Sequence, residues 1–141
     1  MTSARKMPDE QNPVSVRDRI AAFEDSAFAR LLDMHITEAR EGYARVEMDC
    51  AGKLNPHGTA HGGAVFSLAD HAFGIASNCG TTHYTAVSVH IQYLLPVKGK
   101  DRLIAVAERI GANGTCETYR VMVYEGDRAV AVFDGVAFRV S

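Results

Sequence analysis

One aspartate stands in the middle of a stretch that otherwise has the composition of a buried helix. The stretch runs from Asn55 to Gly80, NPHGTAHGGAVFSLADHAFGIASNCG, and Asp70 is its single acidic residue. An ionised carboxylate among apolar neighbours is costly unless it is paired or has a function. An aspartate that faces solvent or caps a loop is the alternative, but a solvated helix face normally carries more than one polar residue. Asp70 is therefore the first candidate for chemistry.

The glycines before the apolar run indicate a second chemical feature. Gly58, Gly62 and Gly63 let the backbone turn sharply and approach a ligand closely. The first N–H groups of a helix lack intrahelical partners, and they can hold an anion or a developing oxyanion. Gly62 and Asp70 lie on the order of 12 Å apart at the usual helical rise, too far to touch one reacting carbon. Either the carboxylate serves a site made with a second subunit, or one of the two interpretations is wrong.

Other reactive side chains favour no competing chemistry. His57 and His61 flank glycines in a predicted loop, so no helix sets their geometry for a metal, and no metal site is expected. Cys79 is expected to be a buried, inert thiol rather than a nucleophile. Lys98 and Lys100 either bind a phosphate or keep a loop solvated.

Composition excludes several classes of protein. The 141 residues carry a net charge of −2, which argues against a nucleic-acid partner, because phosphate backbones require a clustered basic surface. No apolar run is long enough to cross a bilayer, and the polar N-terminus MTSARKMPDEQNP does not resemble a secretory signal. Three cysteines without CxxC spacing fit reduced thiols. We therefore expect a soluble, cytoplasmic protein of one domain.

Hydrophobic periodicity predicts an α+β fold. Residues 1–15 are expected to form a flexible arm, and residues 16–141 one domain. A helix from Val16, broken near Ser26, precedes a hairpin that turns at Glu41-Gly42. Four strands follow the central helix, the last two joined at Gly126-Asp127. A helix that is apolar on every side must be enclosed, so an antiparallel sheet is expected to cover one side of it and a partner subunit the other.

Two motifs carry a family resemblance. HGTAHGGAVFSLADHAFGIASNCG and the following VSVHIQYLLPVKGK resemble the PaaI-type (phenylacetate-degradation) branch of the hotdog-fold thioesterases, and the likeness runs from about Leu31 to the C-terminus. The resemblance implies the hotdog fold, an antiparallel sheet wrapped around one central helix. It also implies dimers with a continuous sheet, often paired into homotetramers. The implied activity is hydrolysis of acyl-CoA thioesters without a cofactor, at sites between subunits.

The same resemblance assigns roles to individual residues. Asp70 is implied to be the general base or the nucleophile, and the backbone N–H of Gly62 to polarise the thioester carbonyl. His61, Gly63 and Asn55 are implied to shape the pocket, with Asn55 near the attacking water or the carbonyl. A site between subunits removes the distance problem, because the two key groups then come from different chains.

Two further assignments concern the segment after the helix. Some relatives orient the attacking water with a hydroxyl group on the strand that follows the helix. Counting residues from Asp70 places Ser88 at that position. Aligning the strand by its YLLP end places Ala86 there instead, and alanine has no hydroxyl. Lys98 and Lys100 are expected to contact the phosphates of coenzyme A.

Two rival functions stay open. One is a hotdog hydratase or dehydratase acting on acyl thioesters; the other is a non-catalytic acyl-CoA binding protein, which would not need a carboxylate at residue 70. The acyl group itself is not predicted. Four aromatic residues either line an aryl pocket or fill the core, and core filling is expected for most of them: Phe66, Phe73, Tyr84 and Tyr93.

Overall fold

The chain follows the predicted order of one broken helix, two strands, a central helix and four strands. The structure is a computed structural model, and it describes residues 15–140. Its elements are α1 (Val16–Glu24), α2 (Ala27–Leu32), β1 (Met34–Arg40), β2 (Tyr43–Met48), α3 (Gly62–Asn78), β3 (Tyr84–Tyr93), β4 (Leu103–Ala112), β5 (Cys116–Glu125) and β6 (Arg128–Arg139).

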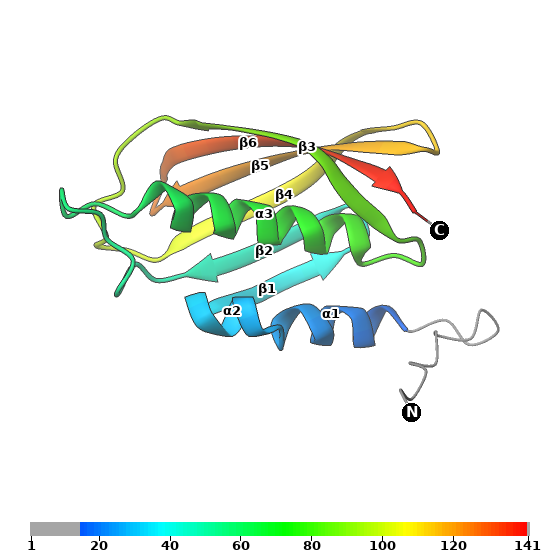
Figure 1. The fold of residues 1–141 in the computed structure, drawn as a ribbon, viewed down its shortest axis with the longest axis horizontal. Helices are drawn as coiled ribbons and strands as arrows, with labels where there is room; N and C mark the ends of the chain where they lie inside the picture. Colours follow the sequence, from blue (N-terminus) through cyan, green and yellow to red (C-terminus); the bar gives the residue numbers. More distant parts are fainter. Residues whose placement is uncertain (1–14, 141) are drawn as a thin grey trace, which may run out of the picture.

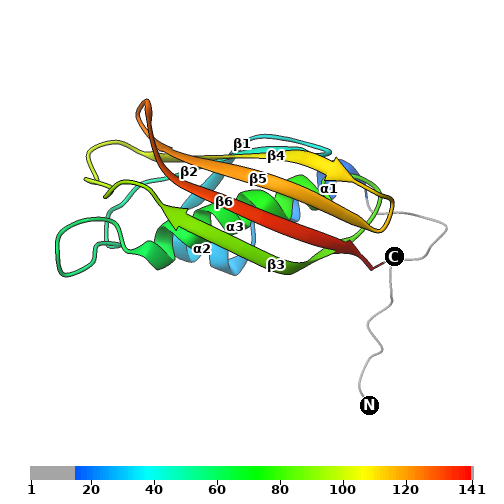
Figure 2. The same ribbon diagram turned by 90° about the horizontal axis from the view of Figure 1, so that it is seen from above.

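The six strands form one antiparallel sheet in the order β1-β2-β4-β5-β6-β3. Gly42 and Gly126 have the positive φ angles, 80° and 62°, that tight turns between strands require. The sheet curves around α3, which lies against one of its faces, while α1 and α2 lie beside β1 (Figure 1). Seen from above, β3 and β6 run side by side over α3 (Figure 2). The predicted α+β hotdog architecture is confirmed.

The N-terminal helix breaks where the sequence predicts. Ser15 caps α1 by accepting a hydrogen bond from the N–H of Asp18 (3.1 Å), and Ser26 caps α2 by accepting one from Ala29 (3.3 Å). Residues 1–14 of the predicted flexible arm lie outside the described residues. None of the helices in residues 15–140 has the length and apolar character needed to span a membrane.

Arg19 fastens α1 to the segment that follows α3. Its side chain is buried, and its guanidinium donates hydrogen bonds to the carbonyls of Gly80 (2.6 Å), Thr81 (3.2 Å) and Thr82 (3.2 Å). A buried guanidinium is tolerated only with such partners, so these bonds hold α1 against the flank of α3.

The core forms where α3 packs on the sheet. Phe73 of α3 is 1% exposed, and its ring lies 5.5 Å from that of Tyr119 and 5.7 Å from that of Phe133. Gly135 of β6 makes this packing possible, because a β-carbon there would lie 2.9 Å from Cζ of Phe73. The opposite face of α3, which carries Asp70, is not buried by the sheet. The helix is thus enclosed on one side in a single chain.

Replacing Gly135 with alanine tests how tightly α3 is seated. The added methyl group has to displace a fully buried ring, so Gly135→Ala is expected to lower the free energy of unfolding by about 1–3 kcal/mol. Gly111→Ala on β4 is the matched control, because no atom of the described residues lies within 4 Å of a β-carbon at that position. Denaturant unfolding measures both variants, and equal stabilities of the two would contradict the packing described.

Candidate active site

The start of α3 leaves one backbone donor without a partner. His61 is the N-cap residue, and its Nδ1 accepts a hydrogen bond from the N–H of Gly63 (2.9 Å). The N–H groups of Ala64 and Val65 both donate to the carbonyl of His61, at 2.9 and 3.2 Å. Among residues 15–140, the N–H of Gly62 has no partner. Of the first four N–H groups of the helix, Gly62 therefore presents the one that is available to a ligand.

The geometry of a trans peptide fixes the direction of that donor. The His61 carbonyl and the Gly62 N–H belong to one peptide group and point to opposite sides of it. Since the carbonyl points along the helix to accept two hydrogen bonds, the Gly62 N–H points back out of the helix start.

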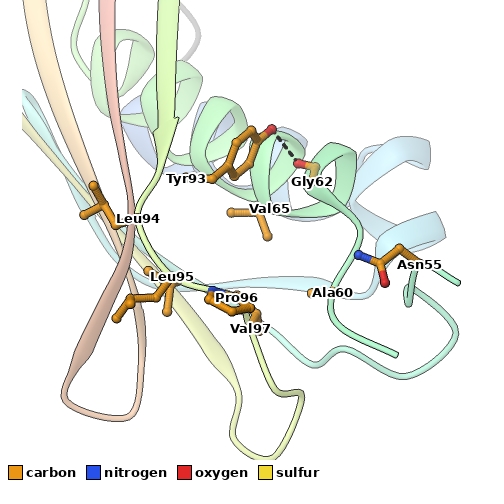
Figure 3. Close-up of a pocket in the computed structure, with 10 residues that line it drawn as sticks. Asn55, Ala60, Gly62, Val65, Tyr93, Leu94, Leu95, Pro96 and Val97 are labelled. Carbon is orange, nitrogen blue, oxygen red and sulfur yellow. Dashed lines mark hydrogen bonds between the residues drawn. The ribbon is translucent and has the colours of Figure 1, made fainter. Parts of the chain in front are cut away.

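An apolar pocket of about 280 Å³ lies beside this helix start (Figure 3). Within residues 15–140, no charged side chain lines it. Asn55 and the hydroxyl of Tyr93 are the polar side-chain groups among its lining residues, so the pocket suits an uncharged group. The lining residues are Asn55, Ala60, Gly62, Val65, Tyr93, Leu94, Leu95, Pro96, Val97 and Val130.

Asp70 lies two turns along α3, outside the lining of this pocket. Its side chain is half-buried on the helix face that also carries Gly63, Ser67 and Gly74. No hydrogen-bond or ion-pair partner contacts its carboxylate within residues 15–140, and burial raises the pKa of Asp70 above its ordinary value. The carboxylate is thus a stronger base than a solvated aspartate.

The flank of α3 next to Asp70 is covered by α1, a contact that sequence analysis missed. Phe23 of α1 packs edge-on against His71, with ring centroids 6.1 Å apart. Nε2 of His71 is buried and has no hydrogen-bond partner in the described part of the chain, and burial lowers the pKa of His71 against the opposing effect of Glu24. A neutral imidazole beside Asp70 adds no cation that would lower the basicity of the carboxylate.

Asn55 organises the loop that leads into α3. Its Oδ1 accepts hydrogen bonds from the N–H groups of His57 (2.9 Å) and Thr59 (3.2 Å), and its Nδ2 donates to Oγ1 of Thr59 (2.8 Å). An amide nitrogen carries two hydrogens, so one donor of Asn55 remains beside the pocket it lines. His57 is exposed on this loop, away from the helix cap that His61 provides.

Comparison with known proteins identifies the family. The model of the Thioesterase superfamily matches residues 57–132. The chain belongs to this superfamily. The Escherichia coli K12 protein named acyl-coenzyme A thioesterase PaaI is 34% identical over 122 residues, which span 85% of this chain and 87% of that protein.

Solved structures agree with this assignment. The E. coli PaaI protein of the phenylacetic acid degradation operon superposes with a TM-score of 0.83 at 32% identity, covering 89% of this chain and 92% of that one. A mutant of PaaI from Thermus thermophilus gives a TM-score of 0.78 at 34% identity, covering 82% and 100% of the two chains. The predicted membership of the PaaI-type hotdog thioesterases is confirmed, and the chain is a thioesterase.

The sheet of this thioesterase turns Ser88 away from α3. Ser88 pairs with Val136, on the face opposite the helix, whereas Ala86 pairs with Ala137 on the helix face. A β-bulge between Ala86 and Ser88 causes the change, because one extra residue reverses which face a side chain takes. We therefore leave Ser88 out of the candidate site, and Ala86 brings no hydroxyl to it.

The loop with Lys98 and Lys100 has a hydrogen-bonded backbone and exposed side chains. The Glu125 carboxylate accepts hydrogen bonds from the N–H groups of Lys98 (3.0 Å), Gly99 (2.8 Å) and Lys100 (3.3 Å). Burial alone would raise the pKa of Glu125, but these bonds and Arg128 hold it below its ordinary value. The two ammonium groups stand at a hollow of about 310 Å³ that Arg102 and Asp101 also line.

The four aromatic candidates and Cys79 lie either in the core or at the pocket. Phe66 and Phe73 pack on Phe133, and Tyr84 packs against the core, so core filling is confirmed for these aromatic predictions. Tyr93 instead lines the pocket. Cys79 is 1% exposed, and burial raises the pKa of its thiol to about 11, as expected of an unreactive cysteine.

The cap at His61 predicts a specific pattern of stability. Removing the imidazole in His61→Ala leaves the Gly63 N–H without its acceptor, so the free energy of unfolding should fall by about 0.5–2 kcal/mol. His61→Asn supplies another good N-cap acceptor and should retain most of that stability. Denaturant unfolding of both variants measures the difference; an equal loss in the two would show that Nδ1 does not stabilise the helix start.

Proposed function

We propose that the protein hydrolyses acyl-CoA thioesters to a free acid and coenzyme A. The observation that carries this proposal is the Asp70 carboxylate, half-buried on an apolar helix and without a protein partner in the described residues. A relative that matches most of the chain is named an acyl-coenzyme A thioesterase, which supplies the substrate class.

The chemistry requires two groups, and the candidate site offers both. As general base, Asp70 takes a proton from a water molecule while the water oxygen attacks the thioester carbon; as nucleophile, it attacks that carbon itself and water then hydrolyses the anhydride. The carbonyl oxygen becomes negative in either route, and the N–H of Gly62 stabilises it. Collapse of the tetrahedral intermediate breaks the C–S bond and releases the thiolate of coenzyme A, a good leaving group.

We propose that the two groups meet between two subunits of a homo-oligomer. About two turns of rigid helix separate them within one chain, roughly 12 Å along the axis. Strand β3 is a ten-residue edge strand with exposed apolar side chains at Val87 and Val89, and such an edge is suited to pair with another strand. A second copy paired there would extend the sheet and bring its own α3 beside the uncovered Asp70 face.

Incubation with a panel of acyl-CoAs, from aryl-acetyl to straight-chain and including a 2-enoyl-CoA that a hydratase could hydrate, tests the activity directly. Release of free thiol from at least one member is expected. Formation of a hydrated acyl-CoA without thiol release would identify a hydratase, and saturable binding without turnover would identify a binding protein; either result would contradict the proposal.

Substitution of Asp70 should separate chemistry from folding. Asp70→Asn keeps the shape but removes the negative charge, so kcat is expected to fall at least about a hundredfold while the unfolding transition is retained. Because burial raises the pKa of Asp70, the wild-type rate should decline, as pH falls, at a higher pH than an ordinary aspartate would give. Near-normal turnover in Asp70→Asn would remove the residue from the mechanism.

The exposed lysines are proposed to bind the phosphates of coenzyme A. Replacing Lys98 and Lys100 with alanine should raise KM for acyl-CoA and leave kcat nearly unchanged, because contacts at an exposed rim act on binding and are screened by salt. A short thioester without the nucleotide should be hydrolysed as before. Arg139→Ala, an exposed cation at the far end of β6, is the control. Equal damage with both substrates would mean that the lysines support the loop and not the phosphates.

A further inference from the structure

Tyr93 connects the edge strand to the start of α3. It is the last residue of β3, and its hydroxyl donates a hydrogen bond to the carbonyl of Gly62 at 2.9 Å, across 31 residues of sequence (Figure 3). The side chain is 54% exposed, so burial of its surface does not account for its place. The next residues hold the strand end in position, since the N–H groups of Leu94 and Leu95 donate to the carbonyl of Val130.

The hydrogen bond from Tyr93 completes a clamp on one peptide group. The peptide between Gly62 and Gly63 has its carbonyl held by Tyr93 and its N–H held by Nδ1 of His61, each at 2.9 Å. Neither glycine has a side chain to restrict its backbone. These two bonds therefore add to the restraint that the two helix hydrogen bonds on the His61 carbonyl already provide. The preceding peptide, between His61 and Gly62, carries the available Gly62 N–H. The φ and ψ angles of Gly62 set its orientation relative to the clamped peptide.

The clamp also explains why residue 62 is a glycine. A β-carbon at this position would lie 3.2 Å from Cζ of Tyr93 and 3.3 Å from its hydroxyl oxygen. A side chain here would therefore require the phenol to shift by a few tenths of an ångström. Gly62 gives room for the tyrosine as well as presenting its own N–H.

We propose that Tyr93 is a positioning residue for the carbonyl-polarising donor of the thioesterase, acting through the Gly62–Gly63 peptide. The phenol proton is committed to the Gly62 carbonyl, so Tyr93 does not donate to the substrate. Its effect is to keep the Gly62 N–H in one orientation before the substrate arrives, which is the condition for oxyanion stabilisation. The inference rests on the proposed role of Gly62 in acyl-CoA hydrolysis.

Tyr93→Phe removes the hydroxyl and keeps the ring. We expect kcat on the preferred acyl-CoA to fall roughly fivefold, the scale of one net hydrogen bond, with KM almost unchanged. Tyr84→Phe is the matched control, because Tyr84 lies on the same strand and its hydroxyl has no hydrogen-bond partner in residues 15–140. A purely structural role would lower the unfolding temperature without this selective loss of kcat.

Amide hydrogen exchange tests the clamp independently of activity. Tyr93→Phe should exchange the Gly63 N–H several-fold faster, whereas Tyr84→Phe should leave it as in the wild type. Unchanged exchange at Gly63 in Tyr93→Phe would overturn the clamp, and faster exchange with an unchanged kcat would overturn its role in positioning. If the wild type released no thiol from any acyl-CoA, the proposed function and the positioning role of Tyr93 would fail together, while the exchange rates would still decide the clamp.

Discussion

A fixed distance within one rigid helix governs the organisation of this thioesterase. Gly62 stands at the start of α3 and Asp70 lies two turns further on, while a thioester carbonyl needs its oxyanion donor and its attacking group within a few ångströms. The helix cannot bend to bring them together, because its inner face is packed on the sheet through residues such as Phe73 and Gly135. The proposed site between subunits follows from this constraint.

The packing that makes α3 rigid also sets the properties of its two candidate catalytic positions, one at the helix start and one in its middle. The sheet covers one face of the helix, and Asp70 lies on the other face. Partial burial there, without a hydrogen-bond or ion-pair partner in the described residues, raises the basicity of its carboxylate. At the helix start, His61 uses its side chain and its carbonyl to occupy three N–H groups, and the N–H of Gly62 is the one left over. Both features arise from how the helix is capped and packed.

Local patterns in the sequence predict most of the fold. Alternating apolar residues, glycine turns at Gly42 and Gly126, and a helix apolar on nearly all sides were sufficient for the strand number and the central helix. Ser26 marked the break in the N-terminal helix because a serine there caps α2. These signals are local, and the structure confirms them.

Features that depend on contacts between distant segments were not predictable. The bulge between Ala86 and Ser88 shifts the strand by one residue, so counting along the chain could not decide which side chain faces α3. The hydrogen bond from Tyr93 to Gly62 and the contact between Phe23 and His71 exist only because β3 and α1 are folded against α3. Residue type and spacing identified Asp70 and Gly62 as candidates, whereas the contacts around them could be known only from the folded structure.

Complementation between two impaired variants tests the shared site most directly. Asp70→Asn and Gly62→Ala are each expected to lose most activity alone, the first because it lacks the carboxylate and the second because its methyl group, at a position that lines the pocket, keeps the thioester carbonyl from the Gly62 N–H. Each hybrid dimer formed by co-expression would contain one site with both substitutions and one with neither. Random assembly of equal amounts should then restore about a quarter of the wild-type activity. Absence of any recovery, with hybrid dimers shown to be present, would mean that one chain supplies both groups and would contradict the account.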